Sequence, residues 1–233
     1  MSKKRIVVLT GAGISAESGI KTFRDSDGLW ENHRLEDVAT PDAWQRNPEL
    51  VLRFYNERRR QLLEVEPNDG HRALVELEQK FEVQIVTQNV DDLHERAGSR
   101  HVLHLHGELR KARSVKNPGL IVTRDTDIQL GDTASDGGQL RPHIVWFGEA
   151  VPMLEPAAKL AEQAEVFLVV GTSLQVYPAA SLMLYSDPDI PYYYVDPRPQ
   201  VNWELGQMPN LTVIAEKASV GLRQVVEKLL GAG

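Results

Sequence analysis

Short apolar runs alternate with amphipathic stretches along most of the chain. Apolar runs of about five residues are typical of strands buried on both faces of a parallel sheet. Six such runs lie at residues Arg5–Thr10, 83–87, 102–105, Val166–Val170, Tyr192–Val195 and Leu211–Ile214. Stretches with helical periodicity lie between them, at residues 49–65, 70–80, 91–97, 157–164 and 218–230. This alternation predicts an α/β fold with a Rossmann-like, doubly wound parallel sheet.

Two stretches interrupt the alternation of strands and helices. Residues 31–66 are mostly helical, and residues 108–140 are polar with weak strand signals. We expect both stretches to form one small subdomain above the ends of the strands. The large Rossmann-like part of the same single domain then consists of residues 1–30, 67–107 and 141–233.

Composition narrows the classes of function. Of the 233 residues, 42% are hydrophobic and 25% charged, which is ordinary for a soluble globular protein. The net charge of -7 argues against nucleic acid as a partner. The sequence has no cysteine, which excludes disulfides, thiolate zinc sites and a cysteine nucleophile. No segment predicts a signal peptide or a membrane span, so we expect a cytoplasmic protein that contacts no membrane.

A glycine-rich turn follows the first predicted strand. Residues 11–16, GAGISA, fit the G-x-G-x-x-G/A fingerprint of a dinucleotide-binding turn between a strand and a helix. Gly11 permits the tight turn, Gly13 lets a pyrophosphate approach the backbone, and Ala16 allows close helix–strand packing. The N–H groups at the start of the following helix would face the phosphates. A purely structural role for the glycines is the alternative interpretation.

The acidic residue that usually completes this fingerprint is missing after the second strand. Asp196 instead ends the predicted strand Tyr192–Val195, where its carboxylate could accept hydrogen bonds from ribose hydroxyls. A carboxylate there would repel a 2′-phosphate, which favours NAD over NADP, although Arg198 weakens this preference. The GTS turn at residues 171–173 follows another strand, at the edge where open α/β sheets bind ligands.

Polar side chains follow two more of the predicted strands. Gln88, Asn89 and Asp91 come after the second apolar run, and His106 comes after the third. Polar groups that converge on one edge of a sheet are what a catalytic crevice needs. Helix capping is the alternative for Asn89 and Asp91, because both are good N-cap residues.

The histidines near the third run allow two interpretations. His104 and His106 share one face if the strand continues, and His101 lies nearby, so a metal site is conceivable. No carboxylate or cysteine stands at a familiar ligand spacing, so we expect no metal. His104 is interpreted as a packed strand histidine. His106, which precedes a glycine at a strand end, is the candidate for acid–base work near neutral pH.

Six sequence blocks resemble, in order, the signature motifs of the sirtuin family of NAD-dependent protein deacylases. They are GAGISAESGI at 11–20, TFR at 22–24, QNVD at 88–91, HGE at 106–108, WFGE at 146–149 and GTS at 171–173. The resemblance covers nearly the whole chain. It implies one sirtuin-type catalytic domain that uses NAD as co-substrate. The implied partners are acyl-lysine proteins or peptides, and we expect a monomer.

The resemblance also implies roles for individual residues. His106 would be the general base, and Asn89 with Asp91 would hold the nicotinamide amide. The implied NAD contacts are Gly11, Ala12, Gly13, Ser15, Glu17, Phe23, Arg24, Gln88, Asn89, Asp91, Gly171, Thr172, Ser173, Asp196 and Ala218. The implied substrate contacts are Tyr55, Arg58, Phe147, Gly148, Glu149 and Val176. Residues 146–149 and 174–177 would pair with the substrate backbone as two flanking strands.

The implied reaction needs neither a metal nor a protein nucleophile. The acyl oxygen of the modified lysine attacks C1′ of the ribose as nicotinamide leaves. His106 then removes a proton from a ribose hydroxyl, so that the sugar oxygen can attack the former acyl carbon. Hydrolysis gives free lysine and O-acyl-ADP-ribose.

The chain departs from the family where most sirtuins bind a structural zinc. Their two Cys-x-x-Cys pairs lie between the HGE and WFGE blocks. The corresponding regions here read RSVKN at 113–117 and DTASDGG at 132–138, without a thiolate. We therefore expect no zinc. The small subdomain must be held by its own packing, although zinc can supply much of such a module's folding energy.

A second departure concerns the acyl group. Tyr55 and Arg58 lie one turn apart on one helix face, and a Tyr-x-x-Arg here resembles sirtuins that prefer succinyl and malonyl groups. A guanidinium can bind a distal carboxylate bidentately, and a phenol can add a hydrogen bond. A solvated helix face is the alternative, because Arg58 belongs to a run with Arg59 and Arg60.

Three other functions remain to be compared with deacylation. A mono-ADP-ribosyltransferase would share NAD and His106 but use a different acceptor. A non-catalytic NAD-sensing module would have no need of the intact Asn89, Asp91 and His106. Hydride transfer by a Rossmann dehydrogenase is disfavoured by the missing acid after the second strand and by the polar residues 88–91.

Overall fold

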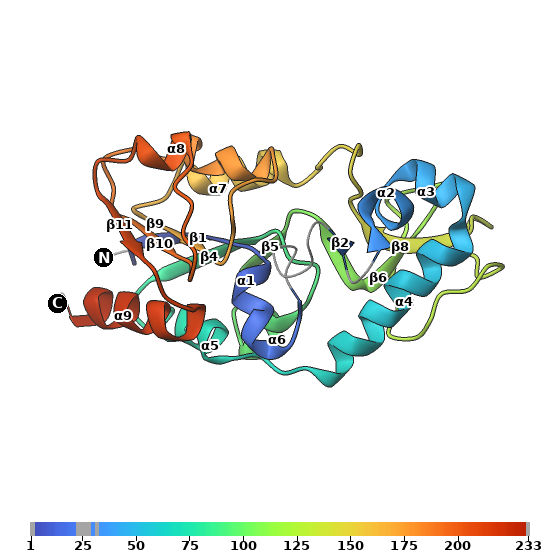
Figure 1. Cartoon of the computed structure of the whole chain (residues 1–233), viewed down its shortest axis with the longest axis horizontal. Helices are drawn as coiled ribbons and strands as arrows, with labels where there is room; N and C mark the ends of the chain where they lie inside the picture. The colour runs from blue at the N-terminus through green and yellow to red at the C-terminus, as the bar shows by residue number, and fades with distance from the viewer. Residues whose placement is uncertain (1–2, 22–28, 31–32, 232–233) are drawn as a thin grey trace.

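The computed structural model describes residues 3–21, 29–30 and 33–231, which form two lobes (Figure 1). The larger lobe is built on a six-stranded parallel sheet in the order β11-β10-β9-β1-β4-β5. The strands are β1 (Arg5–Thr10), β4 (Glu82–Thr87), β5 (Val102–His104), β9 (Val166–Val170), β10 (Tyr192–Val195) and β11 (Leu211–Ile214). From β1 the chain extends the sheet first to one side and later to the other, so β1 marks the topological switch point. The predicted Rossmann-like fold class is confirmed.

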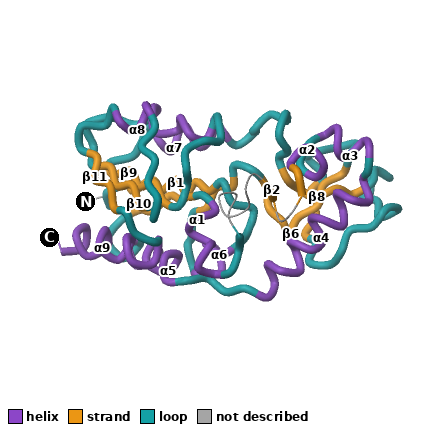
Figure 2. The backbone as a smooth tube through the Cα atoms, viewed as in Figure 1, coloured by secondary structure: helices purple, strands orange, loops and turns teal. Residues whose placement is uncertain are grey.

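Helices cover both faces of this sheet (Figure 2). They are α1 (Ala12–Ser15), η1 (Ala16–Ser18), α5 (Asp69–Leu77), α6 (Leu93–Ala97), α7 (Leu154–Ala161), η3 (Ala179–Tyr185), α8 (Trp203–Gly206) and α9 (Ala218–Gly231). In β1, Val7 and Leu9 pack into the core with α7, η3 and α8, and Ile6 and Val8 pack into the core with α5 and α9. All four side chains are fully buried. Each such burial contributes roughly 1.5–3 kcal/mol, which explains why β1 is apolar on both faces.

The smaller lobe combines a three-stranded antiparallel sheet, in the order β7-β6-β8, with three helices. Its elements are β2 (Leu29–Trp30), β3 (His33–Arg34), α2 (Leu35–Val38), α3 (Pro41–Arg46), α4 (Pro48–Glu64), β6 (Gly107–Ser114), β7 (Ile121–Thr123) and β8 (Leu140–Ile144). The side chain of Asn47 caps α4 by accepting a hydrogen bond from the N–H of Leu50. The small sheet runs four residues past the boundary expected at residue 140, because β8 pairs with β6.

Several elements of the structure differ from the sequence prediction. α5, α6 and α7 are displaced by two or three residues at one or both ends from the predicted helices, and η3, β6 and β8 were not predicted. The hydrophobic pattern did not predict β6, because the outward side chains of this strand are charged. Its buried positions include Gly107 and Ser114, which carry little or no apolar surface. β8 buries Arg141 among its apolar neighbours.

Asn56 pins the polar loop of the small lobe onto α4. Its side chain donates to the carbonyl of Ile128 and accepts from the Ile128 N–H, both at 2.9 Å. Arg59 is fully buried beside it, donating to the carbonyl of Leu109 at 2.8 Å and to Asn56 at 2.7 Å. Because buried backbone groups are costly to leave unpaired, this arrangement holds a loop with few apolar side chains.

We expect Asn56→Ala to lower the free energy of unfolding by about 2 kcal/mol, since two buried backbone groups of Ile128 lose their partner. Urea denaturation followed by circular dichroism measures the change. Asn117→Ala is the matched control, because Asn117 is exposed and only closes a surface turn with Gly119. Equal stabilities of the Asn56 and Asn117 variants would show that the pin contributes nothing.

A hydroxyl–carboxylate cluster joins the two regions, 113–117 and 132–138, in which the sequence predicts no zinc site. The Ser114 hydroxyl contacts both carboxylate oxygens of Asp136, at 2.9 and 2.8 Å, and accepts from the Lys116 N–H at 3.0 Å. Asp136 also accepts from the Gly138 N–H, and a Cβ on Gly138 would lie 2.2 Å from the Ser114 hydroxyl oxygen. A hydroxyl and a single carboxylate beside a lysine are not a zinc ligand set.

We expect chelation to leave both activity and thermal stability unchanged. Among residues 3–21, 29–30 and 33–231, no group of three or more His, Cys, Asp or Glu side chains is placed to hold a metal ion. Metal analysis of the purified protein, and melting curves with and without EDTA, measure this. One tightly bound zinc per chain, or activity lost on chelation, would mean that other ligands had been recruited.

Within the same described residues, no helix is both long and apolar enough to cross a membrane.

Candidate active site

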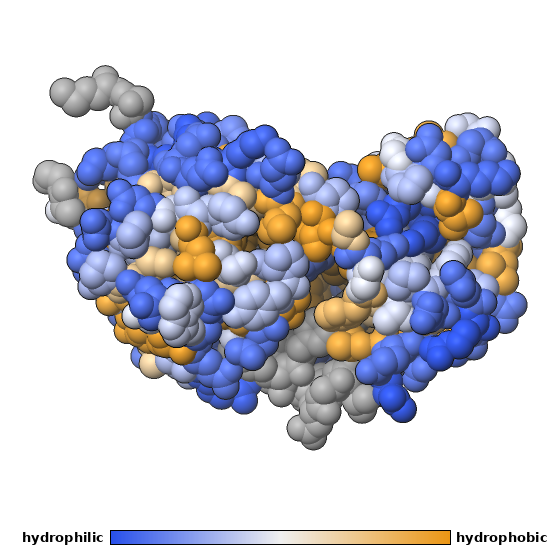
Figure 3. Space-filling model, turned by 90° about the horizontal axis from the view of Figure 1, so that it is seen from above, coloured by the Kyte–Doolittle hydropathy of each residue, from blue (hydrophilic) through white to orange (hydrophobic). Residues whose placement is uncertain are grey.

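The expected site residues lie along the carboxyl edge of the parallel sheet. The surface is hollowed between the two lobes in the space-filling view (Figure 3). The loops after β1, β4, β5, β9 and β10 carry, respectively, Gly11, Asn89, His106, Thr172 and Asp196. Because these strands are parallel and adjacent, their ends bring the polar groups to one edge at the switch point. Phe23 and Arg24 lie outside the described residues.

The two glycine-rich turns are packed against each other. Gly11 donates its N–H to Val170 at 3.0 Å, and Gly13 donates to Gly171 at 2.8 Å. A Cβ on Gly13 would lie 2.6 Å from the Cα of Gly171, and Gly171 has a φ of 62°. The close contact with Gly171 is therefore a sufficient reason for the missing side chain at Gly13. This contact fits the structural role that the sequence left open as the alternative, and the phosphate contact itself stays a prediction.

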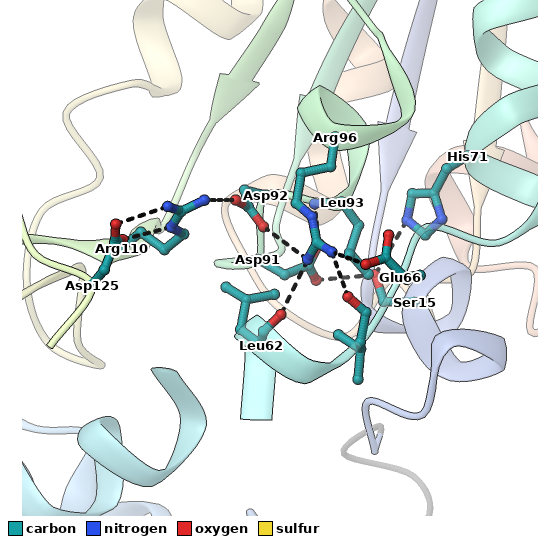
Figure 4. Close-up of polar contacts among 11 residues, drawn as sticks. Ser15, Leu62, Glu66, His71, Asp91, Asp92, Leu93, Arg96, Arg110 and Asp125 are labelled. Carbon is teal, nitrogen blue, oxygen red and sulfur yellow. Dashed lines mark hydrogen bonds and ion pairs between the residues drawn. The ribbon is translucent and has the colours of Figure 1, made fainter. Parts of the chain in front are cut away.

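Ser15, Asn89 and Asp91 form a buried polar network. Figure 4 shows Ser15 between Asp91 and His71. The Ser15 hydroxyl donates to Asp91 at 3.0 Å and accepts from the Asn89 amide at 3.1 Å. Burial raises the pKa of Asp91 to about 6, although hydrogen bonds from Leu93 N–H and Ser15 act against this rise. Further hydrogen-bond donors would stabilise the buried carboxylate, and the N–H₂ group of an amide ligand can supply them.

His71 sets the direction of this network. Its Nδ1 accepts the N–H of Asn68 at 3.3 Å, which places the ring proton on Nε2, 3.5 Å from the Ser15 hydroxyl oxygen. Burial lowers the pKa of His71 to about 4, so the ring is neutral at physiological pH. With a donor behind it, Ser15 turns its own hydrogen toward Asp91.

His106 is arranged as a base. Its Nδ1 lies 3.0 Å from the carbonyl oxygen of Gln88, which can only accept, so Nδ1 carries the proton and Nε2 keeps its lone pair. Burial lowers the pKa of His106 below its ordinary value of 6.5, and the Gln88 carbonyl partly offsets this. The imidazole is consequently neutral at pH 7 and able to take up a proton at Nε2.

His104 differs from His106 in that both of its ring nitrogens are engaged. Nδ1 lies 3.0 Å from the carbonyl of Asn89, and Nε2 lies 2.8 Å from the Glu95 carboxylate. Burial acts to lower the pKa of His104, but the hydrogen bond and charge of Glu95 raise it overall. This geometry agrees with the interpretation of His104 as a packed structural histidine.

Other residues expected to contact NAD already hold parts of the protein together. Gln88 donates to the Thr172 hydroxyl at 3.1 Å, which links the loops after β4 and β9. The Glu17 carboxylate accepts from the N–H and hydroxyl of Ser219 in the first turn of α9. Asp196 is buried and accepts the Arg198 N–H at 2.8 Å. Any contact of these groups with NAD would be additional to these bonds.

Ala12, Ser173 and Ala218 complete the expected NAD set. Ala12 begins α1 directly after Gly11, and Ser173 follows Thr172 in the loop after β9. Ala218 is buried at the start of α9. A Cβ added to Gly70 would lie 3.0 Å from the Cβ of Ala218, so the two residues are closely packed.

Arg58 is largely buried on α4, with 15% of its side chain exposed. Its guanidinium stacks over Phe54 at 5.0 Å, and Nη2 lies 3.7 Å from Glu57. Its Nε and Nη1 atoms are buried and have no hydrogen-bond partner in the described part of the chain. Arg60, in contrast, is exposed and paired with Asp127. The solvated-face interpretation therefore fits Arg60 and not Arg58.

Tyr55 is fully buried one turn before Arg58. Its hydroxyl oxygen accepts a hydrogen bond from the indole N–H of Trp146 at 3.0 Å. Burial raises the pKa of the Tyr55 phenol, so the hydroxyl keeps its hydrogen at neutral pH.

The two segments expected to flank the substrate are not strands in the structure. Residues 146–149 form a turn, in which Phe147 is 43% exposed and Gly148 has a φ of 88°. Residues 174–177 are irregular. The N–H of Phe147 donates to Ala39, and the carbonyl of Val176 accepts from Ala180. Those two backbone groups are thus engaged within the chain.

The Glu149 side chain is likewise engaged within the protein. Its carboxylate pairs with Arg113 and Arg141 and accepts the backbone N–H of Trp146. The substrate contact expected for Glu149 stays a prediction and would be additional to these bonds.

Sequence reasoning missed the polar contacts that join the two lobes (Figure 4). Arg96 of α6 donates to the carbonyls of Leu62 and Val65, at 3.1 and 2.6 Å, where α4 ends without a basic residue of its own. Asp92 pairs with Arg110 of β6 at 2.7 Å. The only sequence signal was the four-residue spacing of Asp92 and Arg96 on one helix face.

Comparison with known proteins places the chain in a family. The model of the Sir2 family matches residues 11–178. A protein of Helicobacter pylori (strain ATCC 700392 / 26695) named NAD-dependent protein deacylase is 56% identical over 227 residues, covering 97% of this chain and 98% of the relative. A Bacteroides thetaiotaomicron protein of the same name is 50% identical over 235 residues, covering 98% and 99% of the two chains.

Solved structures agree with this assignment. A complex of a Sir2 homologue with NAD has a TM-score of 0.85 at 38% identity, covering 99% of this chain and 91% of that one. A Sir2 complex with a p53 peptide and NAD⁺ has a TM-score of 0.78 at 30% identity, covering 99% and 95%. The chain belongs to the Sir2 family. The enzyme class expected from the sequence, an NAD-dependent protein deacylase with NAD as co-substrate, is thereby confirmed.

Proposed function

We propose that this enzyme removes acidic acyl groups, succinyl and malonyl, from lysines of proteins or peptides, in addition to acetyl. The products would be nicotinamide, unmodified lysine and O-acyl-ADP-ribose. One observation carries the acidic-acyl part: Arg58 is a largely buried cation with two donor atoms that have no hydrogen-bond partner among the described residues.

The burial of Arg58 argues for an anionic ligand. Taking a guanidinium out of water is costly unless it is paired, and the nearest carboxylate, Glu57, lies only at 3.7 Å. A carboxylate at the end of an acyl chain would supply two acceptor oxygens to the free donors. Tyr55, one turn away and protonated, would add a hydrogen bond. An acetyl group offers no such charge, which gives the pocket its preference.

The carboxyl edge of the sheet supports the proposed NAD site. Asn89 and the Asp91 carboxylate would hold the nicotinamide amide, and Ser15 is hydrogen-bonded to both side chains. The loops 11–16 and 171–173 would face the phosphates, and Asp196 would face a ribose. NAD supplies an electrophilic ribose carbon when its nicotinamide is held at this edge.

His106 would act as the general base at its free Nε2. The Gln88 carbonyl fixes its tautomer, so no proton has to move before the base can accept one. Trp146 to Glu149 and residues 174–177 would contact the peptide on either side. These segments are not strands in the structure, so pairing with the peptide as two flanking strands would have to extend them.

We expect the acid limb of the pH profile to reflect His106. Because burial lowers its pKa below 6.5, the neutral base persists as the pH falls through 7 and is lost only below 6.5. The value of kcat/KM for deacylation should therefore stay constant between pH 8 and pH 7. A fall with its midpoint at or above pH 7 would contradict this assignment of the base.

An acyl panel on one peptide sequence tests the proposed preference. Acetyl-, succinyl- and malonyl-lysine versions of the peptide are compared at saturating NAD by mass spectrometry. We expect succinyl and malonyl peptides to have kcat/KM values at least equal to that of the acetyl peptide. Activity confined to acetyl-lysine would overturn the acidic-acyl proposal and leave the deacylase class intact.

A further inference from the structure

Trp146 reaches the proposed acyl pocket from a segment 91 positions away in sequence. It follows β8, which lies beside α4 (Figure 1), and only 2% of the residue is exposed. An indole N–H can donate but not accept. The Tyr55 oxygen is therefore the acceptor of their 3.0 Å bond, and the hydrogen of Tyr55 points away from the indole.

Trp146 is itself held by charged side chains. The guanidinium carbon of Arg141 lies 3.2 Å from the centre of the indole ring system. Arg141 pairs with Glu149 at 2.7 Å, and Glu149 accepts the N–H of Trp146 at 2.8 Å. Burial acts to raise the pKa of Glu149, but the hydrogen bonds from Arg141 and Trp146 lower it overall, so it stays ionised. A cation stacked on a buried indole and anchored by a carboxylate leaves the ring little freedom.

A phenol without a donor can rotate its O–H between two orientations in the ring plane. A donor on one side of the oxygen excludes the orientation in which the O–H points toward that donor. The O–H is then already in the remaining orientation before a ligand binds, so binding does not have to restrict it. In the proposed pocket that ligand group is a carboxylate beside Arg58.

We propose that Trp146 is a positioning residue for acyl-chain selection. It fixes the Tyr55 hydroxyl so that the phenol donates to the distal carboxylate of a succinyl- or malonyl-lysine. Arg141 and Glu149 act behind it by fixing the indole. This inference rests on the proposed acidic-acyl function and names a residue outside the Tyr55–Arg58 pair that sets it.

The test is Trp146→Phe, which keeps an aromatic ring and deletes the N–H donor. The readout is the ratio of desuccinylation to deacetylation kcat/KM on one peptide. Both rates come from the same preparation, so the ratio does not depend on how much of the variant is folded. Loss of one hydrogen bond should lower the ratio by about 3- to 10-fold. The change should lie in the KM of the succinyl peptide, with kcat retained.

Two further variants separate positioning from general damage. Trp44 packs against Trp146 at 5.8 Å, and its indole makes no hydrogen bond among the described residues. Trp44→Phe should therefore leave the ratio unchanged. In a Tyr55→Phe background the phenol is gone, so Trp146→Phe should cause no further fall in the ratio.

Three results would overturn the inference. They are an unchanged ratio in Trp146→Phe, an equal fall in Trp44→Phe, and a fall of the same size in the Tyr55→Phe background. Arg58→Met measured in parallel identifies which claim has failed. If Arg58→Met lowers the ratio and Trp146→Phe does not, only the positioning role is wrong. If Arg58→Met also leaves the ratio unchanged, the acidic-acyl pocket itself is wrong.

Discussion

His106→Ala is expected to lower deacylation by roughly 100-fold or more, the usual scale for losing a general base. The fold and the affinity for NAD should remain nearly intact, because the ring makes only one hydrogen bond within the described chain, to the carbonyl of Gln88. Turnover is measured with an acyl-peptide, and NAD affinity by calorimetry.

His101→Ala is the matched control for this variant. His101 is exposed five residues earlier, just before β5. It should keep the wild-type rate. Near-wild-type turnover in a folded, NAD-binding His106→Ala protein would sink the assignment of the base.

Arg58→Met is expected to cut desuccinylation by roughly 30-fold or more. Removing one partner of a desolvated charge pair typically costs about 2–5 kcal/mol, and each 1.36 kcal/mol corresponds to about tenfold in rate. Deacetylation should fall little or even rise, because an acetyl group has no distal charge and the pocket becomes less polar. The loss should appear mainly in KM if the contact is equally strong in ground and transition states.

Arg60→Met controls for a change of charge on the same helix. Arg60 lies two positions further along α4, where it is exposed and paired with Asp127. The Arg60→Met variant should therefore leave both activities unchanged. If desuccinylation and deacetylation fall together in Arg58→Met, then Arg58 is structural and the pocket does not select acidic chains.

The sheet of the large lobe could be predicted because its strands are buried on both faces. Val166–Val170 and Tyr192–Val195 are strands over the residues that the apolar runs predicted. The strands of the small lobe could not be predicted in the same way. Ser114 and Arg141 occupy buried positions in β6 and β8 only because Asp136 and Glu149 satisfy them from elsewhere in the chain.

The candidate site likewise has features that could be predicted from the sequence and features that could not. Polar residues at strand ends were predictable, because parallel strands bring their carboxyl ends together whatever lies between them. The direction of the hydrogen bonds was not, since it depends on partners such as His71, 56 positions from Ser15. The same holds for Trp146 on Tyr55, which joins two lobe segments that no spacing rule connects. A family pattern suggested Tyr55 and Arg58, but the burial that distinguishes Arg58 from Arg60 came from the structure.

Desuccinylation coupled to the cleavage of NAD is tested by analysis of the products formed from NAD and a succinyl-lysine peptide. We expect wild-type enzyme to release nicotinamide, unmodified peptide and O-succinyl-ADP-ribose in equal amounts, with no metal added. Transfer of ADP-ribose to the peptide or to the enzyme, with the succinyl group left on lysine, would contradict it. So would consumption of NAD that proceeds at the same rate without an acyl-peptide.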